Sequence, residues 1–185
     1  MKKFFAALFL LLITFAAVAQ PYAVGTASIG VDQGTTNGFS IGAGYRLARY
    51  VAIEAAYNDL PRSTESSTSI STASSQTWEG YSLSISAIGY LPLARELSMV
   101  GRLGAHRVSA DVRSSEVTYA GSPPVVTSAT DRSSSESFWA PAVGLGLQLD
   151  LGRYIGRLMY EQLKADSTAR PRDLRTVLLS VGRHF

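Results

Sequence analysis

Cysteine is absent from this chain of 185 residues, and histidine occurs only twice. Without cysteine there is no disulfide framework, no thiolate nucleophile and no cysteine ligand for a metal ion. The sequence also lacks a phosphate-binding loop, a dinucleotide fingerprint and any spacing typical of a metal site. We therefore expect neither a cofactor nor a bound metal.

Long apolar runs are also missing, except near the N-terminus. The run from Phe4 to Phe15 follows Lys2 and Lys3 and precedes Ala17-Val18-Ala19, as in a secretory signal peptide. The alternative, an anchoring helix, needs about 20 apolar residues. We expect residues 1–19 to be a signal peptide and residues 20–185 to be the mature domain, in which no segment is apolar for long enough to form a membrane-spanning helix.

Neither sign of charge dominates the mature domain. The whole chain has 17 basic and 14 acidic residues, and loss of Lys2 and Lys3 brings the two signs close to balance. The basic isoelectric point of the full chain is therefore no indication of nucleic-acid binding. We expect no nucleic-acid partner.

Hydrophobic residues make up 46% of the sequence. They lie largely in short segments in which apolar residues alternate with polar or small ones. Val143, Leu145, Leu147 and Leu149 occupy one face of a predicted strand, and Ala142, Gly144, Gly146 and Gln148 occupy the other. Eight segments show this alternation. In one of them the apolar residues change from one face to the other, and we expect a β-bulge near Ala87 at that point. The eight segments are 22–30, 39–47, 51–58, 80–91, 97–109, 139–150, 154–163 and 174–185.

The connections between these segments are alternately short and long, which is typical of an outer-membrane barrel with short periplasmic turns and longer extracellular loops. The last strand, ending at Phe185, must pair with the first to close such a sheet. The sequence thus predicts an all-β fold, an eight-stranded antiparallel up-and-down transmembrane β-barrel. The competing fold, a soluble periplasmic β-barrel, would have to turn the apolar faces inward.

Two extracellular connections stand out by length, 60–77 and 110–137. The first is dominated by Ser and Thr and is predicted to be a solvated flexible loop. The flanks of the second, Val112 to Tyr119 and Val125 to Ser128, could extend the neighbouring strands as a hairpin. Any surface interaction is expected to use these two segments.

Charged side chains occupy the face opposite the apolar one. This face carries Glu54, Arg102, Gln148, Arg157 and Glu161, and in a membrane barrel it lines the lumen. Opposite charges at one height of a narrow lumen should pair, so we expect a Glu54–Arg157 or a Glu54–Arg102 ion pair. A role in filling the lumen is favoured over conduction or gating.

Aromatic residues lie near the ends of several predicted strands. We expect these to form the girdles that mark the two membrane interfaces: Tyr45, Tyr57, Tyr90, Trp139, Tyr154 and Phe185.

Several motifs, in this order and spacing, resemble the OmpA-like family of small eight-stranded outer-membrane barrels over the whole mature chain. They are Gly42–Arg46, Ala52–Tyr57, Ile88–Tyr90, Gly101–Ala105, Arg157–Tyr160 and Leu179–Phe185.

The resemblance implies an outer-membrane location, contact with membrane lipid, and recognition of the C-terminal stretch with Phe185 by the assembly machinery. It also implies that Glu54 and Arg157 belong to a lumenal charge network. A lumenal lysine of the family matches Ala87 here and a glutamate matches Gln148, so that network is expected to be thinner. The peptidoglycan-binding domain of longer relatives is expected to be absent.

The favoured function is therefore a structural or surface-interaction role, with an extracellular partner that the sequence does not name. One alternative is a barrel enzyme that modifies lipid A as a deacylase or acyltransferase, for which His106, Ser109 and Asp111 would be the candidates. A narrow pore is another, although eight strands leave little lumen. We expect no catalytic activity.

Overall fold

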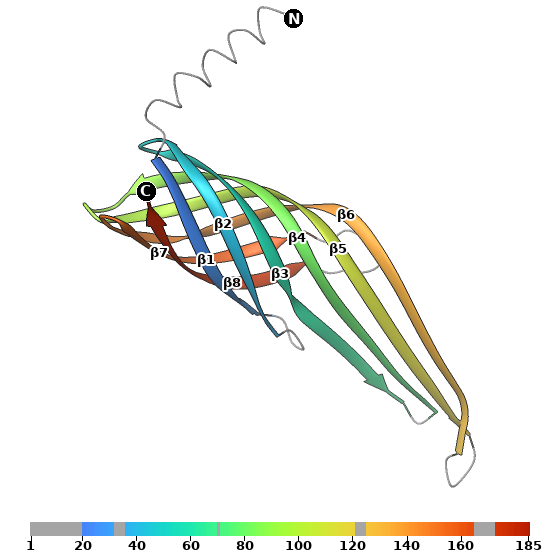
Figure 1. Ribbon diagram of the computed structural model, residues 1–185. Coiled ribbons are helices and arrows are strands. Elements are labelled where there is room, and N and C mark those ends of the chain that lie inside the picture. The colour runs from blue at the N-terminus through green and yellow to red at the C-terminus, as the bar shows by residue number, and fades with distance from the viewer. Residues whose placement is uncertain (1–19, 32–35, 70, 121–124, 165–172) are drawn as a thin grey trace, which may run out of the picture.

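The computed structural model describes residues 20–31, 36–69, 71–120, 125–164 and 173–185. The predicted signal peptide, 1–19, lies outside these residues. Eight strands follow one another along the chain (Figure 1). They are β1 (Gln20–Gly30), β2 (Asn37–Ala48), β3 (Val51–Thr68), β4 (Thr72–Pro92), β5 (Leu97–Ala120), β6 (Val125–Leu151), β7 (Tyr154–Leu163) and β8 (Leu174–His184).

The strands form one closed antiparallel barrel. Each pairs with the next, and β8 returns to pair with β1, so that Ala27 lies opposite Leu179 and Gly25 opposite Val181. The predicted up-and-down barrel is confirmed. Both chain ends of the barrel lie at the end that carries the short turns (Figure 1), which is the periplasmic end in a barrel of this kind.

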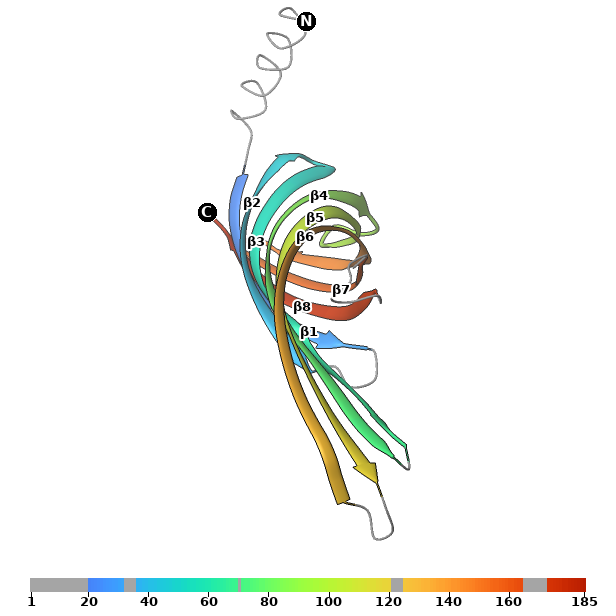
Figure 2. The same ribbon diagram turned by 90° about the vertical axis from the view of Figure 1, so that its right-hand side faces the viewer.

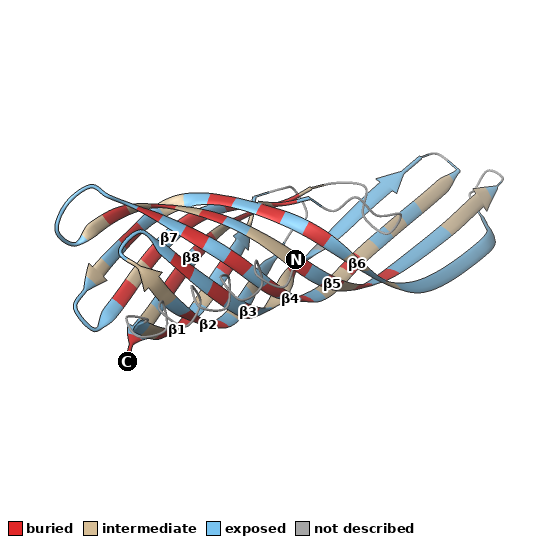
Figure 3. Cartoon of the chain, turned by 90° about the horizontal axis from the view of Figure 1, so that it is seen from above, coloured by how far each residue is buried: buried red, intermediate tan, exposed pale blue. Residues whose placement is uncertain are grey.

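Large apolar side chains cover the outside of the barrel. Leu103, Val181 and Ile41 are each exposed over more than 60% of their surface, and buried and exposed residues alternate along every strand of the barrel wall (Figure 3). In water such a continuous apolar surface would cause aggregation, whereas in a bilayer it is the surface that contacts lipid. Among the described residues, none belongs to a helix long and apolar enough to cross a membrane.

Segment 60–77, predicted to be a loop, is mostly strand, which corrects that prediction. In 110–137 the predicted hairpin is confirmed, because the flanks Val112 to Tyr119 and Val125 to Ser128 continue β5 and β6. β3, β4, β5 and β6 continue far beyond the other strands as a four-stranded sheet (Figures 1 and 2). Ser66 pairs with Ser75, Ser75 with Ser115, and Ser115 with Asp131. Both faces of this sheet meet water, so its sequence has no hydrophobic alternation, the signal by which strands are recognised.

The predicted bulge near Ala87 is also wrong. β4 keeps one register with β3 from Leu60↔Gly80 to Val51↔Gly89, and it keeps one register with β5 throughout. The irregularity in the β3–β4 ladder lies instead between Leu60 and Ser63. Pro61 stands there, and proline lacks the N–H group that a regular ladder requires.

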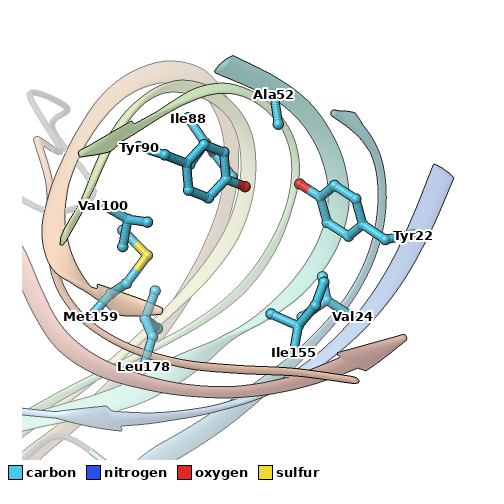
Figure 4. Packing of buried hydrophobic residues seen from close by; sticks show 9 residues of the cluster. All are labelled: Tyr22, Val24, Ala52, Ile88, Tyr90, Val100, Ile155, Met159 and Leu178. Carbon is cyan, nitrogen blue, oxygen red and sulfur yellow. The ribbon is translucent and has the colours of Figure 1, made fainter. Parts of the chain in front are cut away.

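Without a bulge at Ala87, Ile88 and Tyr90 point into the barrel. Tyr90 was predicted to belong to an interface girdle, but it is buried in the lumen, with its hydroxyl group directed toward that of Tyr22 (Figure 4). Gly44 allows Tyr22 to take this position, because a Cβ atom at Gly44 would lie 2.4 Å from the Tyr22 ring.

The interior contains two apolar layers. The periplasmic layer is built around Tyr22, Ile88, Val100 and Met159 (Figure 4), and the extracellular layer around Trp78, Val108, Leu163 and Leu174. On β5, Arg102 lies between Val100 and Val108. On β7, Glu161 lies between Met159 and Leu163. Charged side chains therefore form a layer between the two apolar ones.

Candidate functional site: a buried charge layer in the lumen

The charge layer is assembled from strands that lie on different sides of the lumen. Glu54 comes from β3, Arg102 from β5, and Arg157 and Glu161 from β7; all four are buried. Residues an even number apart on a strand share a face, so Arg157 and Glu161 both point inward. Barrel closure then brings β3 and β7 across the lumen from each other.

Glu54 is the centre of this layer. Its Oε2 atom lies 2.9 Å from Nη1 of Arg157, and its Oε1 atom lies 3.2 Å from Nη2 of Arg102. The hydroxyl group of Tyr22 also donates a hydrogen bond of 3.0 Å to Oε2. The two ion pairs predicted as alternatives are thus present together.

Arg102 joins Glu54 to the second carboxylate. Its Nη1 atom lies 3.3 Å from Oε2 of Glu161, and its Nε atom donates a hydrogen bond of 3.0 Å to Ser86. Two arginines and two glutamates therefore neutralise one another in the interior of the barrel. Such an arrangement stabilises the fold only if each ion keeps its partner.

The match of Ala87 to the lumenal lysine of the family is corrected by this geometry. Ala87 faces outward, whereas its neighbours Ser86 and Ile88 face the lumen. Ile88 lies opposite Arg102 in the β4–β5 register. The second cation of the layer is therefore supplied at the same height by β5.

Gln148 continues the polar contacts toward the periplasmic end. Arg157 donates a hydrogen bond of 2.9 Å to its Oε1 atom, and Gln148 donates one of 3.1 Å to Asp150. Asp150 pairs with Arg46 at 3.2 Å and lies 3.4 Å from His184. The sequence prediction omitted Asp150 and Arg46, although they lie two residues from Gln148 and Gly44 and therefore on the same inward face of their strands.

His106 closes the layer on the extracellular side. Its Nδ1 atom is hydrogen-bonded to Ser82 at 3.0 Å, and its Nε2 atom lies 3.9 Å from Glu161. A cavity of about 30 Å³ adjoins His106, Arg102 and Glu161, which is room for a water molecule or two. Among the described residues, no group of acidic residues and histidines is arranged to hold a metal ion.

The structure does not bring together the residues considered for an enzyme. His106 faces the lumen, whereas Ser109 and Asp111 lie at odd positions of β5 and face outward. The hydroxyl group of Ser109 is bonded to Ser137 at 2.9 Å. A nucleophile and a base on opposite faces of one strand cannot act on the same substrate.

The other predicted girdle residues all point outward. Tyr45, Tyr154 and Phe185 lie toward the periplasmic end, and Tyr57 and Trp139 lie toward the extracellular end, each well exposed. Tyr57 stacks on Tyr81 with ring centroids 5.9 Å apart. Aromatic side chains thus flank the apolar belt at both ends, as bilayer interfaces favour.

The family of proteins described as the outer membrane protein beta-barrel domain matches residues 4–185 of this sequence. The chain belongs to this family. The protein is accordingly an outer-membrane β-barrel, and its exposed apolar belt lies against membrane lipid. A search of curated protein sequences gave no significant match.

Two solved structures, of CarO and of a designed barrel, share the fold. CarO of Acinetobacter baumannii is 12% identical with a TM-score of 0.52, over 88% of this chain and 97% of CarO. A de novo designed transmembrane β-barrel is 11% identical with a TM-score of 0.52, over 90% of this chain and 95% of the design. Ail of Yersinia pestis is 16% identical with a TM-score of 0.49, over 90% of this chain and 98% of Ail. At these identities the likeness concerns the fold alone.

Proposed function

We propose that this barrel is a surface-interaction protein whose β3–β6 extension presents a free strand edge to an extracellular partner. The barrel anchors the extension to the membrane surface, and the extension carries the recognition. The two segments from which the sequence predicts surface interaction, 60–77 and 110–137, make up most of this sheet.

The observation that carries the proposal is the outer edge of β6. β6 runs from Val125 to Leu151, but its pairing with β7 begins only at Ala142↔Leu163, next to a hydrogen bond from Lys164 to the carbonyl oxygen of Pro141. From Val125 to Ala140, no described residue pairs with β6 on that side. A strand edge of this length is a template for the addition of another strand.

The direction of the free backbone groups follows from that same hydrogen bond. Because Pro141 offers its carbonyl group to β7, every second residue before it also directs its N–H and C=O groups to the free edge. These residues are Ala129, Asp131, Ser133, Ser135, Ser137 and Trp139. The intervening residues bond to β5 instead.

Proline at two of these positions should block strand addition and leave the sheet intact. The variant Ser133→Pro/Ser135→Pro removes two free-edge donors without removing a bond to β5. We expect extended peptides, selected on phage against the folded wild-type protein, to bind this variant at least about tenfold more weakly.

The matched control is Ser133→Ala/Ser135→Ala, which removes the hydroxyl groups and keeps both N–H groups. It should bind the selected peptides like the wild type. Equal binding to the proline variant would contradict recognition through the edge, and loss of binding in the alanine variant would assign recognition to the side chains.

Two other functions have less support. A pore would need an open lumen, whereas the charge layer and the two apolar layers fill this one. A lipid A-modifying enzyme would need its base at the lipid-facing rim, whereas His106 is buried inside. We therefore propose that the barrel has no catalytic activity.

Phe185 is proposed to be the residue through which the assembly machinery recognises the chain. It follows β8, it is exposed on the barrel exterior, and its ring lies 5.9 Å from the Arg183 guanidinium. Deleting Phe185 should lower the amount of folded protein in the outer membrane more than deleting 64–77, the tip of the β3–β4 hairpin. Heat-modifiable mobility of outer-membrane fractions measures both, and equal levels would contradict the assignment.

A further inference from the structure

One face of the extension carries a hollow that is separate from the free strand edge. The hollow has a volume of about 340 Å³ and is formed by β4, β5 and β6, which lie side by side beyond the barrel (Figure 2). Its volume is at the lower end of the range for small-molecule sites, about 300–1,000 Å³. Every residue that lines it is a serine, a threonine, an arginine or an aspartate.

Two rows of side chains cross the three strands at the hollow. The first row is Thr77, Arg113 and Ser133, and the second is Ser75, Ser115 and Asp131. The two rows are two residues apart on each strand, so all six side chains lie on the same face of the sheet. Ser75 and Thr77 are half-buried, whereas the other four are exposed. Hydroxyl groups therefore surround a small number of charged groups.

The charged groups of the hollow have both signs and do not pair. Arg113, Arg132 and Asp131 form neither a salt bridge nor a side-chain hydrogen bond with any part of the chain that the structure describes. Elsewhere on the extracellular side an arginine does pair, since Arg62 lies 2.6 Å from Glu79. Two guanidinium groups and one carboxylate are therefore available to a ligand in the hollow.

The chemistry of the lining restricts the class of ligand. An apolar molecule would meet no apolar side chain here. A small inorganic anion could bind the arginines, but Asp131 would repel it and the hydroxyl groups would have no role. Sugar hydroxyl groups both donate and accept hydrogen bonds, as serine and threonine hydroxyl groups do. A carboxylate is the group that pairs with guanidinium through two parallel hydrogen bonds.

The position of the hollow shows from which side a ligand approaches. Ser133 is six residues from Trp139 of the aromatic girdle, which is about 20 Å along β6 at 3.3 Å per residue. The hollow is therefore clear of the lipid surface and open to the medium outside the cell.

We propose that this hollow binds a sugar unit that carries a carboxylate, at the end of a glycan on another surface. Arg113 and Arg132 bind the carboxylate, Asp131 accepts hydrogen bonds from ring hydroxyl groups, and the serine and threonine rows contact the remaining hydroxyl groups. This site goes beyond the strand-addition function, because it uses side chains on the face of the sheet, whereas strand addition uses backbone groups at its edge. Each can therefore fail without the other.

The test compares 3′-sialyllactose, which ends in a carboxylate-bearing sugar, with lactose, which lacks that sugar. The folded full-length barrel is kept in a detergent without a sugar headgroup, and binding is titrated by saturation-transfer NMR. We expect the wild type to bind sialyllactose at least about tenfold more tightly, because the charge-assisted pairs form only with the carboxylate. The variant Arg113→Gln/Arg132→Gln should lose this preference.

The matched control, Arg49→Gln/Arg95→Gln, removes the same charge from exposed positions in the periplasmic turns. It should keep the preference for sialyllactose, and loss of the preference would assign it to net charge and contradict the proposal. Folding of each variant is checked by heat-modifiable mobility, and Arg113→Gln alone replaces the double variant if that fails to fold.

Three further results would overturn the proposal. One is equal affinity of the wild type for the two sugars, a comparison that needs no variant. Another is an unchanged preference in Arg113→Gln/Arg132→Gln. The third is displacement of sialyllactose by an equal concentration of acetate, which would indicate a site for any carboxylate rather than for an acidic sugar.

Discussion

Replacing Glu54 with glutamine is expected to destabilise the folded barrel by about 3–5 kcal/mol. Glu54 is the carboxylate that contacts both Arg157 and Arg102, and glutamine keeps its shape but not its charge. The variant therefore leaves two guanidinium groups in the lumen with Glu161 as their remaining carboxylate. The cost arises from buried charge without compensation rather than from lost packing.

Urea-induced unfolding in lipid vesicles measures this loss, with heat-modifiable mobility as the check on folding. Glu96→Gln is the control, because Glu96 lies exposed in the periplasmic turn between β4 and β5; its loss should change stability by less than about 0.5 kcal/mol. A similar small change for Glu54→Gln would contradict the central place of Glu54 in the charge layer.

The second large effect is expected from a charge placed on the lipid-facing belt. Leu145 lies on the outer face of β6, exposed over 59% of its surface, and it is paired with Gly101 on one side and Tyr160 on the other. These pairs lie near the middle of the belt. Leu145→Arg should therefore cost about 2–4 kcal/mol, as expected for arginine at the bilayer midplane.

Val125→Arg is the matched control on the same strand. Val125 has a similar exposed fraction, 61%, but it lies at the tip of the extension, where the side chain meets water. Its replacement should leave the free energy of unfolding in vesicles nearly unchanged. Equal losses for the two variants would mean that the outer face of β6 is not divided into a membrane part and a water part.

Prediction of the fold succeeded wherever one face of a strand meets lipid and the other meets the lumen. Val143 to Leu149 shows why, because the alternation records two different environments. The prediction was wrong for Ser66 and Ser75, which lie in strands that have water on both sides. Only pairing with neighbouring strands keeps these residues extended. Such pairing requires no alternation of hydrophobic and polar residues in the sequence of either strand.

Prediction of the charge layer succeeded for a similar reason. Parity placed Glu54, Arg102 and Arg157 on the inner face, and the similar distance of each from its periplasmic turn placed them at one height. Tyr90 was assigned to the wrong face because an assumed bulge at Ala87 reversed its parity. One inserted residue moves every following side chain of a strand to the opposite face, so a bulge assumed at the wrong place assigns all of them wrongly.

The sequence by itself determined, for most strand positions, which residues face lipid and which face the lumen, because this follows from a period of two along a single strand. The alternation of short and long connections and the apolar last strand indicated a closed barrel of eight strands. The tertiary structure decided that Glu54 pairs with both arginines and that four strands continue beyond the membrane. These features depend on the register between strands distant in the sequence. Register is set by the backbone hydrogen bonds of the closed sheet, and no single strand contains it.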